Sequence, residues 1–143
     1  MILLDTNVVS EPWRLQPSGA VRTWLDAQDA STLYLCTPVL AELRFGAERL
    51  PRDARRRRLD ENIDRLHVYV FRDRILPFDI AAAFEFGRVG ALRERMSRRM
   101  EPLDAMIAAI ALAHDFKLAT RDIDDFTDLD LELINPFEAS VER

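Results

Sequence analysis

Residues 1–7 read Met-Ile-Leu-Leu-Asp-Thr-Asn, a short apolar run that ends in an acid. The run Ile2–Leu4 predicts a short buried strand, and Asp5 stands where that strand should end. A second apolar pair, Leu118-Ala119, is followed by Thr120-Arg121-Asp122. The chain therefore has two expected strand ends that carry an aspartate.

Short β-type runs alternate with longer helical patterns along the rest of the chain. Strands are expected at Ile2–Leu4, Leu33–Cys36, Leu118–Ala119 and Leu131–Ile134, with further extended stretches at Val68–Phe71 and Ile75–Leu76. Helices are expected at Thr6–Glu11, from Ser18 to about Leu25, from Thr37 to about Arg49, from Asp53 to about Leu66, from Ile80 to about Arg95 and at Leu103–Ala113. This alternation predicts an α/β fold whose mainly parallel sheet is covered by helices on both faces.

Local signals add detail to several of these helices. Leu103–Ala113 is apolar nearly all round, so this helix should be buried. In the helix that begins at Ile80, we expect the packed side to carry Ala83, Phe86 and Gly87. Helix N-caps are expected at Ser18, at Thr37 (with Pro38 in the first helical position) and at Asp79.

Length and composition indicate one soluble globular domain spanning residues 1–143, with 48% hydrophobic and 31% charged residues. The single cysteine, Cys36, allows no disulfide within the chain, which fits a reducing compartment. The apolar run at residue 2 meets Asp5 at once, so no signal peptide is expected. The longest apolar run, residues 105–113, is too short to span a membrane. We therefore expect a cytoplasmic protein without membrane association.

The net charge of −5 argues against a general polyanion binder, because nonspecific affinity for nucleic acid comes mainly from basic surface. It does not exclude a nuclease, since bound divalent cations offset acidic charge. Other chemistries have few of the residues they need. His67 and His114 stand at no zinc-like spacing from Cys36, and four glycines form no phosphate loop. A phosphatase of the two-aspartate type would need an acid where Asn7 stands.

Four acids, far apart in the chain, are expected at one edge of the sheet. Asp5 and Asp122 follow strands, and Glu42 lies in the first turns of the helix after the second strand. Asp104 begins a helix that leads back to the strand Leu118-Ala119, so it too belongs at the carboxyl edge. Open α/β sheets bind ligands at this edge. We expect the four carboxylates to converge there.

Each acid also has a simpler explanation when taken alone. Asp5 could cap the next helix, and Asp104 is favoured near a helix N-terminus by the macrodipole. Glu42 could be a solvated helix residue, and Asp122 an ordinary loop aspartate. Four such explanations would have to coincide to place all four acids at one sheet edge, so a shared function explains their positions better. Clustered carboxylates bind hard cations such as Mg²⁺, which activate a water for attack on a phosphodiester.

The chain resembles PIN-domain ribonucleases of the VapC/FitB type, the toxins of type II toxin–antitoxin pairs, over nearly its full length. The resemblance rests on Leu4-Asp5-Thr6-Asn7-Val8, residues 37–46 with Glu42, Pro77-Phe78-Asp79, residues 104–111, Leu118-Ala119-Thr120-Arg121-Asp122 with Asp125-Phe126, and Leu133-Ile134-Asn135-Pro136-Phe137. It implies a three-layer α/β/α PIN-like domain with a central, mainly parallel sheet. The implied partners are an RNA substrate, a cognate antitoxin protein and a second copy of the chain, with a higher hetero-oligomer formed by toxin and antitoxin.

The resemblance also implies an Mg²⁺-dependent endoribonuclease, with Mn²⁺ as an alternative ion. The catalytic acids would be Asp5, Glu42, Asp104 and Asp122, of which Asp5, Asp104 and Asp122 would bind the metal. Supporting residues would be Thr6, Asn7, Thr120, Arg121 and Asp125. The fourth acidic position is shared between Asp122 and Asp125, with Asp122 preferred. The alternative function is a PIN-like module that binds RNA or a partner with little or no catalysis.

Overall fold

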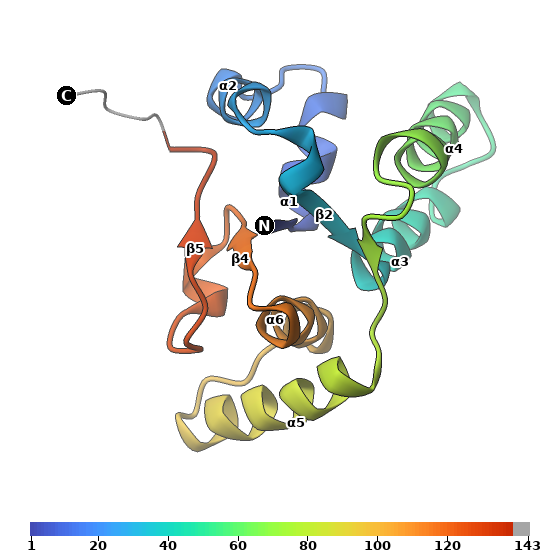
Figure 1. The fold of residues 1–143 in the computed structure, drawn as a ribbon. Coiled ribbons are helices and arrows are strands. Elements are labelled where there is room, and N and C mark those ends of the chain that lie inside the picture. The colour runs from blue at the N-terminus through green and yellow to red at the C-terminus, as the bar shows by residue number, and fades with distance from the viewer. Residues whose placement is uncertain (139–143) are drawn as a thin grey trace.

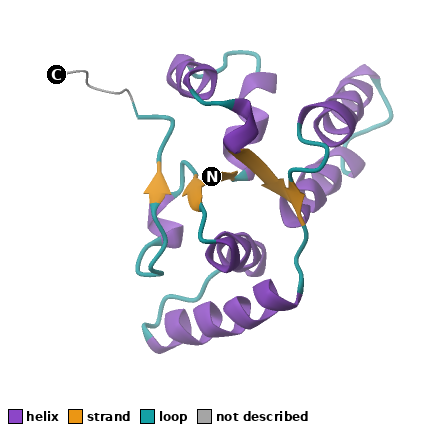
Figure 2. Cartoon of the chain, viewed as in Figure 1, coloured by secondary structure: helices purple, strands orange, loops and turns teal. Residues whose placement is uncertain are grey.

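A five-stranded sheet lies at the centre of the computed structural model, which describes residues 1–138. Its strand order is β3-β2-β1-β4-β5, and every pair of neighbours is parallel. Figure 2 shows helices above and below the strands. The strands are β1 (Ile2–Leu4), β2 (Leu33–Cys36), β3 (Ile75–Leu76), β4 (Lys117–Ala119) and β5 (Leu133–Ile134).

Helices cover both faces of this sheet, so the predicted α/β fold with its mainly parallel sheet is confirmed. In Figure 1, α6 packs beneath the sheet with α5 outside it, while α1 and α2 lie on the opposite side. The α-helices are α1 (Thr6–Ser10), α2 (Gly19–Ala27), α3 (Thr37–Glu48), α4 (Ala54–Arg65), α5 (Ile80–Arg95) and α6 (Pro102–His114). The shorter helices are η1 (Glu11–Trp13), η2 (Ala30–Thr32), η3 (Leu66–Val70) and η4 (Ile123–Phe126).

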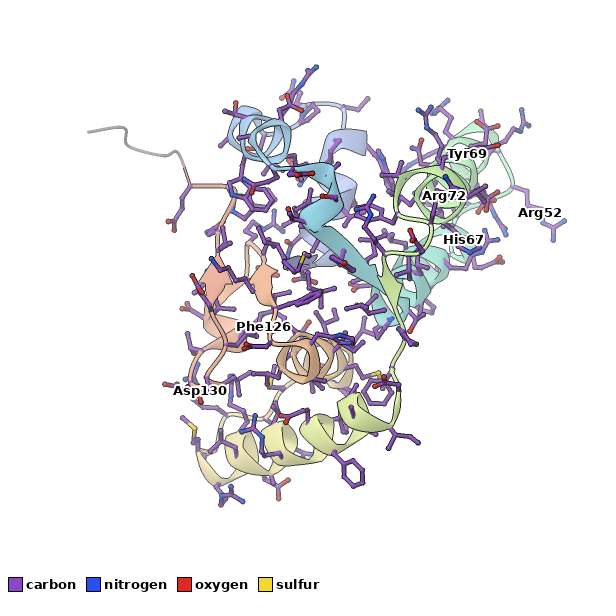
Figure 3. All side chains as sticks on the ribbon, viewed as in Figure 1. Arg52, His67, Tyr69, Arg72, Phe126 and Asp130 are labelled. Atoms are coloured by element: carbon purple, nitrogen blue, oxygen red, sulfur yellow. The ribbon has the colours of Figure 1, made fainter. Side chains whose placement is uncertain are left out.

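The core is formed by apolar side chains of the central strands and of α6. Leu3, Leu35 and Leu118 are fully buried, one from each of three neighbouring strands. Ile107 and Ile110 of α6 are equally buried, which confirms the prediction of a buried helix. The ring of Phe126, at the end of η4, closes the core beside β4 (Figure 3). No helix within residues 1–138 has both the length and the apolar character needed to cross a membrane.

Strand register aligns the ends of β1 and β4. Leu4 is paired with Ala119, and the N–H of Asp5 donates to the carbonyl of Ala119 at 2.9 Å. Asp5 and Thr120 directly follow these two strand ends, so they lie side by side at the carboxyl edge. The predicted N-caps Ser18 and Asp79 are confirmed, because each side chain accepts a hydrogen bond from the first turn of its helix.

The stretch Val68–Phe71 was predicted to be extended, and this was wrong. The chain continues from α4 into the π-helix η3, in which the N–H of Phe71 donates to the carbonyl of Leu66 at 2.9 Å. Leu66 and Phe71 are both buried, five residues apart, whereas Tyr69 between them is exposed. Burial of these two anchors explains why β-branched neighbours did not produce a strand.

Two smaller predictions about helices were also wrong. Thr37 is the first residue of α3 instead of its N-cap, and its hydroxyl accepts a hydrogen bond from the N–H of Phe78. On α5 the buried residues are Ala82, Val89 and Arg93; Ala83 and Gly87 are exposed and Phe86 is only half-buried. The Asp79 cap determines where the helix begins, and the core-facing stripe then follows from Ala82 at intervals of seven and four residues.

Candidate active site

Asp5 is the central acid of the site and is almost fully buried at the end of β1. Its Oδ1 accepts from the N–H of Thr6 at 2.8 Å, so Asp5 caps α1. Its Oδ2 accepts from Thr120 Oγ1 at 2.7 Å and from Asn7 Nδ2 at 3.3 Å. The capping role considered for Asp5 is thus real, and it exists together with a place in the acid cluster.

Asp122 is linked to Asp5 through two polar neighbours. Asn7 Nδ2 donates to Asp122 Oδ2 at 3.1 Å, and Asn7 Oδ1 accepts from the N–H of Arg121 at 3.1 Å. The Thr120 hydroxyl accepts from the N–H of Asp122 at 3.0 Å. Asn7 and Thr120 therefore join the loop after β4 to the start of α1.

Glu42 reaches the same region from α3, the helix that follows β2. Thr6 Oγ1 donates to its Oε2 at 2.6 Å. Glu42 is exposed, unlike Asp5, so its carboxylate is open to solvent. The Thr6 hydroxyl thereby connects α3 to the end of β1.

Asp104 lies in the first turn of α6, two residues after Pro102 begins the helix. Its pKa is raised from an ordinary value of 3.8 to about 7, first by burial. The negative charges of four nearby acids raise it further, in the order Asp5, Asp125, Glu42 and Asp122. Burial and nearby negative charge both disfavour the ionised form of a carboxyl group, and burial is the larger cause for Asp104.

The pKa of Asp5 is also raised, with burial as the largest cause. Hydrogen bonds from Thr120 and Thr6 act in the opposite direction, while the charges of Glu42 and Asp122 raise the pKa further. Burial and neighbouring negative charges therefore disfavour the ionised forms of Asp5 and Asp104, and the charges of Glu42 and Asp122 act on both of them. The structure thus brings Asp5, Glu42, Asp104 and Asp122 into one region at the carboxyl edge, while their joint role as metal-binding acids stays a prediction.

Asp125, on η4, belongs to the same cluster. Its charge acts on Asp104 more strongly than that of Asp122 does, whereas Asp122 acts on both Asp104 and Asp5. Both acids border a polar recess of about 500 Å³ beside the cluster. The recess is lined by Arg121, Asp122, Ile123, Asp124, Asp125, Asn135 and Glu138.

The donor set suits a hard divalent cation, because carboxylate oxygens predominate. Asp5 uses three of roughly four acceptor positions for Thr6, Thr120 and Asn7, which leaves one for a cation. Within residues 1–138, no three His, Cys, Asp or Glu side chains are gathered at metal-binding geometry. Hydrogen bonds to threonine and asparagine hold Asp5, Asp122 and Glu42 instead, so cation binding would require some of these side chains to rotate.

The cysteine and the two histidines offer no alternative catalytic group. The pKa of the buried Cys36 thiol is raised to about 12, mainly by burial, which makes it a poor nucleophile. His114 packs its ring 5.4 Å from that of Phe116, and His67 is exposed on η3. In Figure 3, His67 and Arg52 lie at the outer side of the α3–α4 region.

Sequence reasoning missed the contribution of the segment after β5. Asn135 and Glu138 line the recess, and Phe137 places its ring 5.1 Å from the guanidinium carbon of Arg121. Asn135 does stand directly after a strand that is paired with β4, as Asp122 stands near the end of β4 itself. The place of Asn135 at the end of this strand was the one sequence signal that could have assigned it to the site.

Comparison with known protein families gives a match over most of the chain. The family model for the PIN domain matches residues 2–131. The chain belongs to the PIN domain family. The sequence-based resemblance is thereby confirmed, as is the expected three-layer α/β/α architecture.

Curated relatives of this PIN-domain protein match it from end to end. It is 44% identical over 139 residues to the plasmid stability protein StbB of Pseudomonas syringae pv. tomato, covering 97% of this chain and 100% of StbB. It is 40% identical over 138 residues to the VapC ribonuclease Y4jK of Sinorhizobium fredii, covering 96% and 99% of the two chains. It is 36% identical over 137 residues to the toxin FitB of Neisseria gonorrhoeae, with the same coverage of 96% and 99%.

Solved structures agree with this assignment. A chain in the structure of FitAB bound to an IR36 DNA fragment superposes with a TM-score of 0.91 at 34% identity, with full coverage of both chains (100% and 100%). FitAcB from Neisseria gonorrhoeae gives a TM-score of 0.85 at 35% identity, with 96% and 99% covered. VapBC-5 from Mycobacterium tuberculosis, a member of the VapBC family of toxin-antitoxin systems, gives 0.67 at 25% identity, with 93% and 96% covered.

Proposed function

We propose that this PIN-domain protein is a divalent-metal-dependent endoribonuclease and the toxin of a type II toxin–antitoxin pair. The observation that carries the proposal is the hydrogen-bonded group of acids at the carboxyl edge of the sheet, where Asn7 links Asp5 to Asp122 and Thr6 binds Glu42. Relatives named VapC ribonuclease and toxin FitB, each matched over 96% of this chain, support the same reading.

Asp5, Asp104 and Asp122 would hold Mg²⁺, with Mn²⁺ as the alternative ion, and Glu42 completes the catalytic acids. A bound divalent cation supplies a polarised water and offsets negative charge on the scissile phosphate. The Thr120 hydroxyl and the Asn7 amide hold Asp5 and Asp122 in register, and the Thr6 hydroxyl holds Glu42. No side-chain nucleophile is needed.

Asp5→Asn and Asp104→Asn test this assignment. Asparagine keeps the size of each side chain but removes a metal-binding charge, so RNA cleavage in Mg²⁺ should fall at least a hundredfold in either variant. Circular dichroism should show that both variants fold. Wild-type cleavage rates in both variants would remove these residues from the mechanism.

A second candidate function is a PIN-like module that binds RNA or a partner with little catalysis. It is favoured by the hydrogen bonds that occupy the acids within residues 1–138 and by the lack of a gathered three-ligand set there. Isothermal titration calorimetry separates the two functions. An enzyme should take up Mg²⁺ or Mn²⁺ in a manner that Asp104→Asn abolishes, whereas a binding module should show no such uptake.

We further propose that the chain forms a homodimer in the cytoplasm and a higher hetero-oligomer with a cognate antitoxin. The FitAB, FitAcB and VapBC-5 structures support the antitoxin partner by similarity, since VapBC-5 is described as a member of a family of toxin-antitoxin systems. Expression of the chain alone should arrest bacterial growth, and co-expression of its cognate antitoxin should relieve the arrest. Growth arrest by the Asp104→Asn variant would contradict a ribonuclease toxin.

A further inference from the structure

Within residues 1–138, the polar recess beside the acid cluster has a single positive charge among its lining residues. Arg121 supplies this charge, while Asp122, Asp124, Asp125 and Glu138 make the rest of the lining acidic. Such a recess repels RNA unless a fixed cation receives the phosphate backbone. Arg121 is the lining residue with the right charge and geometry for that contact.

Arg121 is held in place from two directions. Its N–H donates to Asn7 Oδ1 at 3.1 Å, which ties the backbone to the same asparagine that contacts Asp5 and Asp122. Its guanidinium carbon lies 5.1 Å from the centre of the Phe137 ring. A guanidinium stacked on an aromatic ring loses little further freedom when it binds an anion.

The contact of Arg121 with Asp122 does not explain this arrangement. Arg121 Nε lies 3.9 Å from Asp122 Oδ1, and both side chains are about half exposed, at 49% and 50%. An exposed ion pair of that length contributes little. The planar guanidinium therefore remains available for a better acceptor, and a phosphate accepts two of its N–H groups at once.

We propose that Arg121 binds a backbone phosphate of the RNA next to the phosphodiester that is cleaved, and that the Phe137 ring holds the guanidinium in position. The inference rests on the proposed ribonuclease function and adds a substrate-binding residue to it. Arg121 is then a substrate contact and Phe137 a positioning residue, and neither contributes to cation binding.

Equilibrium binding tests the phosphate contact without turnover. The probe is a short fluorescein-labelled single-stranded RNA of mixed sequence, titrated with the Asp104→Asn protein in Mg²⁺ at several NaCl concentrations and followed by anisotropy. Adding Arg121→Ala should raise the Kd about tenfold. The slope of log K against log salt should fall by about 0.7, as expected for one lost phosphate contact on a single strand.

Arg49→Ala is the matched control. Arg49 also stacks on a phenylalanine, with its guanidinium carbon 5.4 Å from the Phe45 ring centre, but it stands at the C-terminal end of α3, past Glu42. The variant removes the same charge and the same kind of stacking away from the recess. It should leave both the Kd and the salt slope within about twofold of the parent.

Steady-state cleavage with otherwise wild-type protein tests the role of Phe137. Arg121→Ala should raise KM about tenfold with a much smaller change in kcat, because the contact is made equally in the ground and transition states. Phe137→Leu should raise KM about threefold, and Phe137→Tyr, which keeps the ring, should restore it. Arg121→Lys should keep the salt slope but weaken binding, since a lysine neither stacks in the same way nor binds in a bidentate manner.

Failure of the inference can be told apart from failure of the proposed function. If the wild-type protein cleaves RNA but Arg121→Ala matches Arg49→Ala in Kd, salt slope and KM, the phosphate contact is wrong and the ribonuclease assignment stands. If the wild-type protein binds the RNA without cleaving it, the anisotropy comparison still decides the contact. If it neither binds nor cleaves, both proposals are overturned.

Discussion

Thr120 Oγ1 donates a 2.7 Å hydrogen bond to Oδ2 of Asp5, joining two residues that are 115 positions apart in the chain. Pairing of Leu4 with Ala119 in neighbouring strands places the two side by side. The same hydroxyl accepts from the N–H of Asp122 at 3.0 Å. One buried threonine therefore orients two acids of the proposed metal site.

Thr120→Val should impair both stability and activity. Valine has a similar shape but leaves Oδ2 of Asp5 and the N–H of Asp122 without this partner, which should cost about 2 kcal/mol in urea denaturation. Loss of the hydrogen bond should also raise the pKa of Asp5 further, since that bond lowers it. RNA cleavage should fall about 10- to 100-fold, as when a residue behind a metal ligand is changed. Thr120→Ser should retain most activity; an equally active valine variant would contradict this role.

Asp104 should make the stability of the metal-free protein fall as pH rises. The unfolded chain releases this proton near the ordinary pKa of 3.8, whereas the folded protein keeps it up to a pKa of about 7. The stabilisation linked to the bound proton is complete below the lower pKa and is lost as pH rises through the higher one. In EDTA, the melting temperature should therefore decline between these values.

The Asp104→Asn variant isolates this effect from other titrating groups. It should show a flatter pH profile in EDTA and melt a few degrees above the wild type at pH 8, on the order of 1 kcal/mol. Mg²⁺ should stabilise the wild type more than the variant, because the cation compensates a charge that asparagine lacks. Parallel pH profiles for the two proteins would show that Asp104 titrates normally.

Asp122→Asn and Asp125→Asn should separate the two candidates for the fourth acid. Asp122 is linked to Asp5 through Asn7 and raises the pKa of both Asp5 and Asp104, whereas Asp125 raises that of Asp104. We expect Asp122→Asn to lower Mg²⁺ affinity at least tenfold, and Asp125→Asn to lower it less. Calorimetry with Mg²⁺ measures both variants. The opposite order would assign the fourth position to Asp125.

The place of the acids at one edge was predictable because parallel topology constrains it. Asp5 directly follows a strand, and Asp104 begins a helix that must return to the amino end of β4, so few arrangements of the chain could separate them. The buried helix α6 was predictable as well, because a helix that is buried on all sides has a nearly continuous run of apolar residues. These features depend on order along the chain.

Features that depend on packing between distant segments could not be predicted. Val68–Phe71 has the composition of a strand, but Leu66 and Phe71 reach the core only when the chain continues as a helix. The contact of Phe137 with Arg121 exists because β5 pairs with β4, and neither residue carries a local signal of it. Charge patterning likewise gives no sign that an arginine of α5 is buried.

Arg93 is that arginine, and it connects α5 to the loop that carries Asp125. It is 4% exposed, and Nε donates to the carbonyl of Arg98 at 2.9 Å. Nη1 donates to the carbonyls of Thr127 at 2.8 Å and Asp125 at 3.3 Å. The buried charge is therefore satisfied by backbone carbonyls of the loop between α5 and α6, of η4 and of the residue that follows η4.

Arg93→Met should lower the free energy of unfolding by about 3 kcal/mol, because methionine fills the space but leaves these carbonyls without donors. The melting temperature should fall by roughly 10 °C. Arg88→Ala on the same helix is the control, since Arg88 is exposed and pairs only with Glu85, and it should change stability by less than about 0.5 kcal/mol. If Arg93→Met is as stable as Arg88→Ala, the carbonyls have found water as a substitute. Cleavage by Arg93→Met below its melting temperature should also fall, because η4 would no longer hold Asp125 beside Asp104.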